Sequence, residues 1–185
     1  MYSLPTIVTV NGVEYEITNR ADFRVILDIL MVLDDESLSE LEKRVAILII
    51  FYGEDNIPPD GEEATKEVFR FINCYDDSIG HKTQTKVMSW KQDSQMIIAG
   101  VNRVAGQDVR ALPYYHWFSF IANFMEIGES QLSFVCGIRN KIATGKKLEK
   151  HEKEFKNRNP QYFVWKRDED AVEREKNEIA QMFKL

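Results

Sequence analysis

Apolar side chains recur at intervals of three and four residues along most of this chain, and this spacing limits its fold more than any other feature. Positions i, i+3, i+4 and i+7 share one side of an α-helix, whereas a half-buried strand needs strict alternation. The sequence therefore predicts a mainly α protein, a helical bundle in which each stripe faces a common core. The first three predicted stripes consist of Phe23, Ile26, Leu27 and Leu30; of Leu38, Leu41, Val45, Leu48 and Tyr52; and of Ala64, Val68, Phe71, Ile72 and Tyr75.

Polar side chains that can accept a hydrogen bond from a first-turn amide predict where these helices begin. Asn19 fits the start of the first helix and Asp60 the start of the third. Ser37 and Glu40 have the spacing of a capping box, in which each side chain binds the other residue's backbone amide, at the start of the second.

A β-hairpin is predicted at the N-terminal end. Asn11-Gly12 joins two alternating stretches, and this dipeptide favours a tight turn because both turn residues adopt positive φ. A lone hairpin is only marginally stable in water, so it must pack against the helices. The predicted fold is thus a helical bundle with a minor β component. The alternating residues are Thr6, Val8 and Val10 before the turn and Val13, Tyr15 and Ile17 after it.

The most hydrophobic predicted helix covers residues 114–127, opened by Pro113. Its aromatic side chains extend around more than one side, and two interpretations stay open: the central core of the bundle, or a surface for the apolar side of a partner helix. The next predicted helix, 130–144, contains Gly137, and a close approach by another helix is one reason to keep a glycine there.

The chain organisation predicted from these patterns is a helical domain over residues 1–165, followed by a charged amphipathic helix over 166–185. The polar stretch 76–92 lacks a clear period and is interpreted as a loop or hinge. The longest apolar runs, such as residues 45–52, are far shorter than the roughly 20 residues that span a bilayer, so no membrane segment is expected. The first ten residues do not resemble a signal peptide.

Charge is distributed unevenly along the chain. Residues 1–137 contain 11 Lys and Arg against 21 Asp and Glu, residues 138–167 contain 10 against 3, and residues 168–185 contain 3 against 6. The basic segment 139–167 has three interpretations: a solvated helix whose lysines pair with Glu149, Glu152 and Glu154, a surface for an acidic protein, or a nucleic-acid site with interleaved aromatics. An acidic first half and a basic second part also favour self-association of the head-to-tail kind.

Residues that could support catalysis lack the partners that catalysis needs. His81, His116 and His151 have no neighbour in sequence typical of a triad or a metal site, and Cys74 and Cys136 are expected to be free thiols among apolar side chains. Phosphate-binding glycine loops, nucleophile elbows and zinc or calcium motifs are also missing from the sequence. The sequence therefore predicts no enzyme activity, no catalytic residue, no cofactor and no metal.

Two stretches, LPYYHWFSFIANF and LSFVCGIRNKIATGKK, follow the hairpin and the aliphatic helices in a recognisable order. Over about residues 2–165 the chain resembles the tail assembly chaperones of long-tailed phages and prophages of Gram-positive bacteria, encoded just ahead of the tape-measure gene. The most specific part is the tryptophan-centred helix with Pro113, Trp117 and Phe118, followed by the helix with Ile138 and Arg139.

The resemblance implies a protein that is present in the host cytoplasm during phage assembly and absent from the finished virion. It implies binding to the tape-measure protein and recruitment of tail-tube subunits, with no catalytic or cofactor residue. A long helical tape measure with apolar stripes would aggregate if uncovered, and a helical protein can cover it. A permanent structural tail protein and a nucleic-acid-binding regulator using residues 139–167 remain open. The residues expected to bind protein are Trp117, Phe118 and Phe124 for apolar contact and Arg139, Lys146 and Lys147 for orientation.

Overall fold

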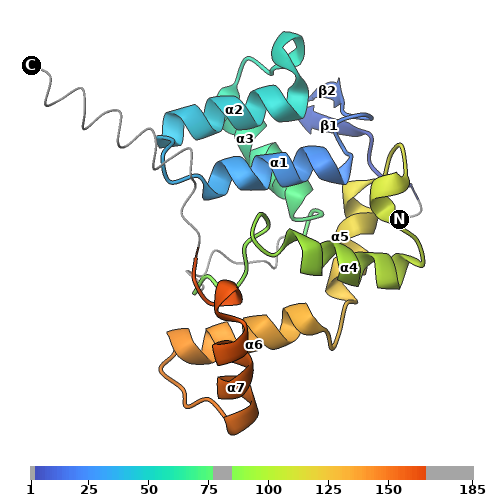
Figure 1. The fold of residues 1–185 in the computed structure, drawn as a ribbon. Helices are drawn as coiled ribbons and strands as arrows, with labels where there is room; N and C mark the ends of the chain where they lie inside the picture. The colour runs from blue at the N-terminus through green and yellow to red at the C-terminus, as the bar shows by residue number, and fades with distance from the viewer. Residues whose placement is uncertain (1–2, 77–84, 166–185) are drawn as a thin grey trace, which may run out of the picture. The chain divides into compact units, whose positions relative to one another are not determined.

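A computed structural model of the protein describes residues 3–76 and 85–165. The described residues are mainly helical, with a single two-stranded antiparallel sheet, which confirms the predicted fold class (Figure 1). They form two compact units. Unit 1 contains residues 3–76 and 112–122, and unit 2 contains residues 85–111 and 123–165.

The elements of unit 1 are β1 (Ile7–Val10), β2 (Val13–Glu16), α1 (Phe23–Asp34), α2 (Glu40–Tyr52), a 3-10 turn (Glu54–Asn56), α3 (Gly61–Ile72) and the first residues of α5 (Trp117–Met125). Those of unit 2 are α4 (Ser94–Ala105), a 3-10 turn (Val109–Ala111), the last residues of α5, α6 (Gln131–Ala143), α7 (Lys150–Arg158) and a 3-10 turn (Pro160–Tyr162).

The hairpin is confirmed. Asn11 and Gly12 have φ values of 51° and 81°, the positive φ that the two-residue turn requires. Val8 pairs with Tyr15 across the strands, and Val8 is buried. The Asn11 side chain donates a hydrogen bond to Asp60 Oδ2 at 3.0 Å, which links the turn to the start of α3.

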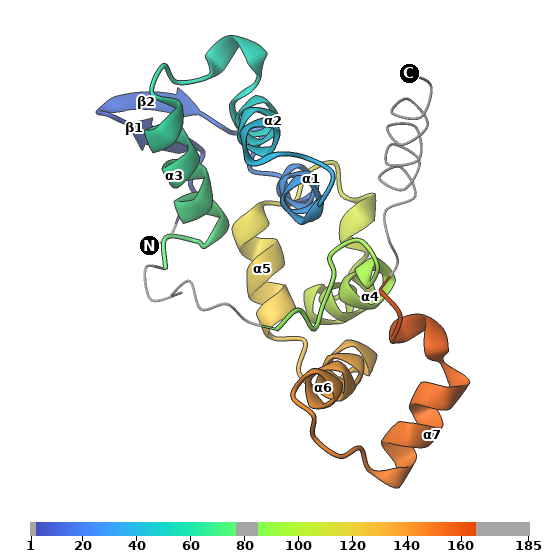
Figure 2. The same cartoon turned by 90° about the vertical axis from the view of Figure 1, so that its left-hand side faces the viewer.

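The core of unit 1 lies between the hairpin and the helices. Helices α1 and α2 run side by side, as both views show (Figures 1 and 2). Aromatic rings connect α2 to α3, with the Phe51 and Phe71 ring centroids 5.3 Å apart, and the Tyr52 hydroxyl donates to Ala64 O at 3.1 Å. The buried apolar side chains of unit 1 are Val8, Val10, Ile17, Ala21, Phe23, Ile26, Ile29, Ile47, Leu48, Phe51, Tyr52, Ala64, Val68, Phe71, Trp117 and Phe120.

In α1 and α2 the side of the helix that is buried differs from the stripe predicted by the sequence. In α1 the third buried position is Ile29, whereas Leu27 and Leu30 are only half-buried. In α2 the buried side chains are Ile47, Leu48, Phe51 and Tyr52, and the predicted core residues Leu41 and Val45 are exposed. Every residue from 45 to 52 is apolar, so the sequence gives no unique stripe there, and the packing of neighbouring elements selects the buried side.

The predicted caps are correct for α3 and wrong for α1 and α2. Asp60 caps α3, its side chain accepting a hydrogen bond from the Glu63 amide at 3.1 Å. Asp22, not Asn19, caps α1. The capping box of α2 joins Ser39 and Glu42 instead of Ser37 and Glu40, because the chain enters the helix two residues later.

The aromatic helix begins at Trp117 and not at residue 114. The preceding residues pair with the start of α1 like a short piece of sheet: the Phe23 amide donates to Tyr115 O at 2.9 Å, and the Trp117 amide donates to Ala21 O at 2.7 Å. Pro113 therefore precedes this pairing and does not open the helix. Contacts across more than ninety residues of sequence decide this boundary, which local propensity cannot show.

The core of unit 2 is smaller, and at one glycine in it the packing leaves no room for a larger side chain. A Cβ atom at Gly100 in α4 would lie 2.7 Å from Ile127 Cδ1. At Gly137 in α6, where a close helix approach was one reason to expect a glycine, no other described segment comes within 4 Å of the Cβ position, so the described residues show no such approach. Helix α6 otherwise agrees closely with the range predicted from the sequence: it begins after the Ser130 cap and ends at Ala143, with Thr144 as its C-cap. The buried apolar side chains are Ile97, Val101, Val109, Ile127, Leu132, Val135 and Ile138.

Two further predictions fall partly or wholly outside the described residues. The hinge predicted at 76–92 contains residues 77–84, which are not described, and residues 85–89 form no helix or strand. The amphipathic helix predicted at 166–185 lies outside the described residues, as does His81.

Candidate interaction surfaces

Trp117 and Phe118 lie in unit 1, where the predicted aromatic contact residues meet other rings of the same unit. Trp117 is buried, and its indole Nε1 donates to Ile72 O at 2.8 Å. The half-buried Phe118 ring lies 5.0 Å from the Phe71 ring and 6.1 Å from the Tyr75 ring. Two interpretations of this helix were open, a core element or a surface for a partner helix. Trp117 is a core residue.

His116 fixes the entry to this helix. Its Nδ1 accepts a hydrogen bond from the Phe118 amide at 3.0 Å, so its Nε2 is left to donate to Pro5 O, also at 3.0 Å. The side chain is buried, as expected for a histidine at the edge of the core that binds backbone. His151, by contrast, is exposed on α7.

Phe124 and Met125 end the aromatic helix and belong to unit 2. The half-buried Phe124 ring lies 5.1 Å from the ring of Trp90, which precedes α4. Met125 beside it is 69% exposed. This end of α5 therefore presents apolar atoms that its own unit leaves uncovered.

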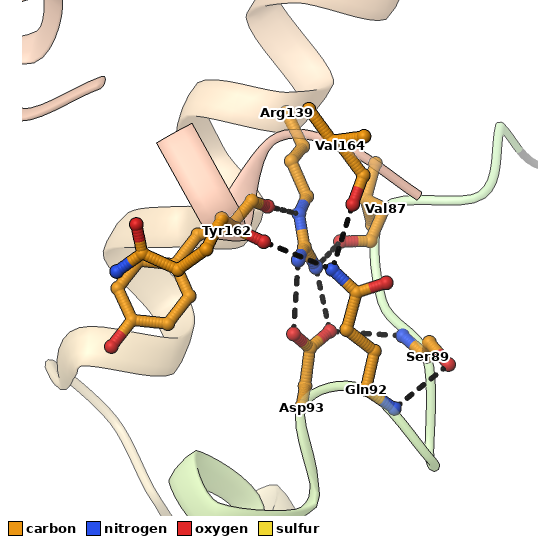
Figure 3. Close-up of polar contacts among 8 residues, drawn as sticks. Val87, Ser89, Gln92, Asp93, Arg139, Tyr162 and Val164 are labelled. Carbon is orange, nitrogen blue, oxygen red and sulfur yellow. Dashed lines mark hydrogen bonds and ion pairs between the residues drawn. The ribbon is translucent and has the colours of Figure 1, made fainter. Parts of the chain in front are cut away.

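Arg139 is buried at the centre of unit 2 (Figure 3). Its two terminal nitrogens donate to the two Asp93 carboxylate oxygens at 2.6 and 2.9 Å, and both side chains are almost wholly removed from solvent. Nη1 also donates to Val87 O at 3.0 Å and Nε donates to Tyr162 O at 2.8 Å. The planar guanidinium thus joins three chain segments, a task that the single ammonium of a lysine could not perform.

Further hydrogen bonds surround the ion pair between Asp93 and Arg139. Asp93 Oδ2 accepts a further hydrogen bond from the Ser89 amide at 2.9 Å, and Gln92 Nε2 donates to Gln161 O and Val164 O at 3.2 and 3.0 Å (Figure 3). The guanidinium carbon of Arg139 lies 4.4 Å from the centre of the Trp165 ring. The segment after α7 is consequently held through its backbone carbonyls.

Lys146 and Lys147 are exposed in the connection between α6 and α7. An ion pair links the two helices on either side of this connection: Lys141 Nζ of α6 lies 2.6 Å from Glu152 Oε1 of α7. This hydrogen bond lowers the pKa of the Glu152 carboxyl and raises the pKa of the Lys141 ammonium. Of the three glutamates expected to pair with nearby lysines, Glu152 is buried and pairs with α6, and Glu149 Oε1 lies 4.0 Å from the same Lys141.

Two aliphatic side chains of unit 1 form a surface that the sequence did not predict. Leu41 is 69% exposed and Val45 is 48% exposed, one helical turn apart on α2. The sequence assigned both to the core because they continue a stripe that is buried further along the same helix.

Comparison with known families gives one match. The family described as Bacteriophage Gp15 protein matches residues 1–163. The chain belongs to this bacteriophage protein family. No curated protein and no solved structure matches it.

The remaining features of this Gp15-family chain can be stated within the described ranges. Over residues 3–76 and 85–165, no group of three or more His, Cys, Asp or Glu side chains is placed to hold a metal ion. No described helix combines the length and the apolar character needed to cross a membrane. Burial raises the pKa of the Cys136 thiol, which lines a shallow depression of about 480 Å³ with Thr85, Val87, Gly137 and Asn140.

The predicted binding residues thus separate into two groups in this Gp15-family structure. One group lies inside the units: Trp117 and Arg139 are buried, and Phe118 and Phe124 are half-buried. The other group, Lys146 and Lys147, is exposed. The residues missed by sequence reasoning are Leu41, Val45 and Met125 as exposed apolar side chains and Asp93 as the partner of Arg139. Nothing in the sequence links Asp93 to an arginine 46 positions later.

Proposed function

We propose that this protein is a tail assembly chaperone that binds the tape-measure protein and helps to recruit tail-tube subunits while the phage tail is built. The match to the bacteriophage family over residues 1–163 carries this proposal, together with the resemblance of the Trp117 and Arg139 helices to such chaperones. In this function no covalent bond is made or broken. The protein acts in the host cytoplasm and leaves before the virion is complete.

The exposed residues indicate which side chains could bind the tape-measure protein. Met125 and the half-buried Phe124 supply apolar surface at the end of α5, and Lys146 and Lys147 supply positive charge after α6. Apolar anchors bind the apolar stripe of a partner helix, while exposed charges steer and orient it. Arg139 supports the fold of unit 2, to which these residues belong, from inside that unit.

Co-expression with the tape-measure protein of the same phage tests the proposal. We expect the tape measure to be soluble and to co-purify with the wild-type chain. Met125→Glu should lower the recovered complex several-fold, because it places a charge where the partner helix is apolar. Leu41→Glu is a matched control, since Leu41 has the same exposed fraction but lies in unit 1. An equally soluble tape measure in the absence of this chain would contradict the chaperone function.

One alternative function has a specific observation in its favour. Lys146, Lys147, Lys150 and Lys153 are all exposed, which suits binding to a nucleic-acid backbone. Stacking of bases is less favoured, because Tyr162 and Phe163 are half-buried against Phe155. Electrophoretic mobility shifts at low salt separate the two functions: a shift that disappears as salt rises supports nucleic-acid binding.

A further inference from the structure

The buried stripe of α2 extends past the part of the core that covers it. Leu48 is buried beside Gly61, whose Cβ position lies 3.6 Å from Leu48 Cδ1, and Tyr52 donates to Ala64 O. Helix α3 therefore covers the C-terminal half of this side of α2. Leu41 and Val45 continue the same side toward the N-terminus of α2, and there the unit leaves them exposed.

Helix α6 of unit 2 ends in a similar way. Its stripe of Leu132, Val135 and Ile138 is buried, and the next position on that side, Ile142, is 42% exposed. The helix ends one residue later at Ala143, with Thr144 as its C-cap, and the exposed Lys146 and Lys147 follow. Each unit thus has one helix whose core-facing stripe continues beyond its own core.

The charges near these two helix ends are opposite. The chain enters α2 through Asp34, Asp35 and Glu36, and Glu40 and Glu42 lie in its first turn. The cations near this turn are Lys43, paired with Glu40 at 3.7 Å, and the exposed Arg44, so the acidic side chains outnumber them. The described residues of unit 1 contain 16 Asp and Glu against 6 Lys and Arg, a formal charge of −10. Those of unit 2 contain 7 against 12, a formal charge of +5.

We infer that the N-terminal half of α2 in one copy of the chain binds the C-terminal end of α6 in a second copy. Ile142 packs against Leu41 and Val45, and Lys146 and Lys147 face the acidic entrance to α2. The two surfaces differ, so a pair of copies leaves one surface of each kind unused. Contacts of this heterologous type produce open chains or rings instead of closed two-fold dimers.

The contact is weak and reversible. Three partly exposed aliphatic side chains form a small apolar centre, well below the roughly 1,000 Å² expected of a stable interface. The charges around it are in solvent, so added salt screens their attraction. Association therefore increases with protein concentration and decreases as the salt concentration rises.

Sedimentation velocity of the purified full chain is the first test. At low salt, the average mass should rise steadily with concentration, and at about 1 M salt, where the screening length is about 3 Å, it should return toward the monomer. A chain that stays monomeric at its highest soluble concentration at low salt would overturn the inference. A fixed dimer mass that is independent of salt would do the same.

Two variants then distinguish a heterologous contact from a symmetric one. Leu41→Glu with Val45→Glu removes the α2 surface, and Lys146→Glu with Lys147→Glu removes the α6 surface. Each double variant alone should associate at least about tenfold more weakly than wild type. An equal mixture should form one-to-one dimers and nothing larger, because each variant retains the surface that the other has lost. Circular dichroism and hydrogen exchange establish that both variants are folded.

Met125→Glu is the matched control for the loss of an exposed apolar side chain and should associate like wild type. Mixed variants that remain monomeric, or equal loss of association in Met125→Glu, would show that the pairing of α2 with α6 is wrong. The inference uses only this chain's own surfaces and does not rest on the tape-measure proposal. Its failure leaves co-expression with the tape measure unaffected, and the converse also holds.

Discussion

Unit 1 and unit 2 stabilise their interiors in different ways. The interior of unit 1 is apolar and aromatic, and its buried carboxylates lie near the surface: Asp22 and Glu67 pair with the partly exposed Arg24 and Arg70. Unit 2 has a smaller apolar core and a wholly buried ion pair between Asp93 and Arg139. Because the cost of desolvating two charges is offset only when both partners are present, unit 2 should respond more sharply to single substitutions.

The difference also extends to the surfaces. Unit 1 is strongly acidic and unit 2 is basic, although neither contains a described cluster of side chains suited to hold a metal ion. The charged residues of unit 2 fall into two kinds: Arg139 and Glu152 fix chain segments inside the unit, while Lys146 and Lys147 are exposed. A basic segment in a sequence can therefore contain both structural and surface cations.

Arg139→Ala should have the largest effect of the substitutions that test this difference between the interiors of unit 1 and unit 2. It leaves the Asp93 carboxylate buried without its partner and should cost roughly 3–5 kcal/mol of stability. Hydrogen exchange followed by mass spectrometry should show faster exchange in peptides of unit 2 and little change in unit 1. The double variant Arg139→Met with Asp93→Leu should lose less than the single one, since no charge is left unpaired. If peptides of both units lost protection from hydrogen exchange equally, the ion pair would not stabilise unit 2 in particular.

Trp117→Phe should weaken unit 1 and spare unit 2. It removes the donor to Ile72 O and part of a buried ring, and leaving that carbonyl unpaired should cost about 1–3 kcal/mol. Hydrogen exchange in α1 and α3 is the measurement. Trp165→Phe is the control, because the exposed Trp165 ring should contribute only about 0.5–1 kcal/mol through its contact with Arg139. A larger effect from Trp165 than from Trp117 would contradict the assignment of Trp117 to the core.

Two glycines of unit 2 should respond in opposite directions to alanine. Gly100→Ala places a Cβ atom against Ile127 and should cost about 1–3 kcal/mol through overpacking. Gly137→Ala meets open space in a helix and should stabilise the protein by up to about 1 kcal/mol. Urea unfolding measures both. A destabilising Gly137→Ala would indicate that this side of α6 is covered in solution.

The smallest expected effect is the acid sensitivity of the α6–α7 connection. The hydrogen bond from Lys141 lowers the pKa of Glu152 below its ordinary value of 4.5, so the ionised carboxylate favours the folded state. This contribution is present above pH 4.5 and is lost as the pH falls through the lowered pKa of the folded state. Comparison of the urea midpoint of wild type and Glu152→Gln across that range measures it. Parallel curves for the two proteins would show that Glu152 contributes nothing to acid sensitivity.

The sequence by itself determined those features that depend on a few neighbouring residues. Asn11-Gly12 specifies the hairpin because both residues tolerate positive φ, and Asp60 begins α3 because its side chain reaches a first-turn amide. The mainly helical class follows from the three-to-four spacing of apolar residues. Lys146 and Lys147 are exposed for a similarly local reason, since the charged segment around them has no apolar stripe strong enough to bury them.

Tertiary structure decided what depends on groups far apart in the chain. The buried side of α2, the start of the aromatic helix at Trp117 and the pairing of Arg139 with Asp93 are all set by partners tens of residues away. Helical spacing shows which side chains share a side of a helix, but burial depends on what packs against that side. Leu41 and Leu48 share one stripe of α2, and only Leu48 is covered, because α3 begins beside it.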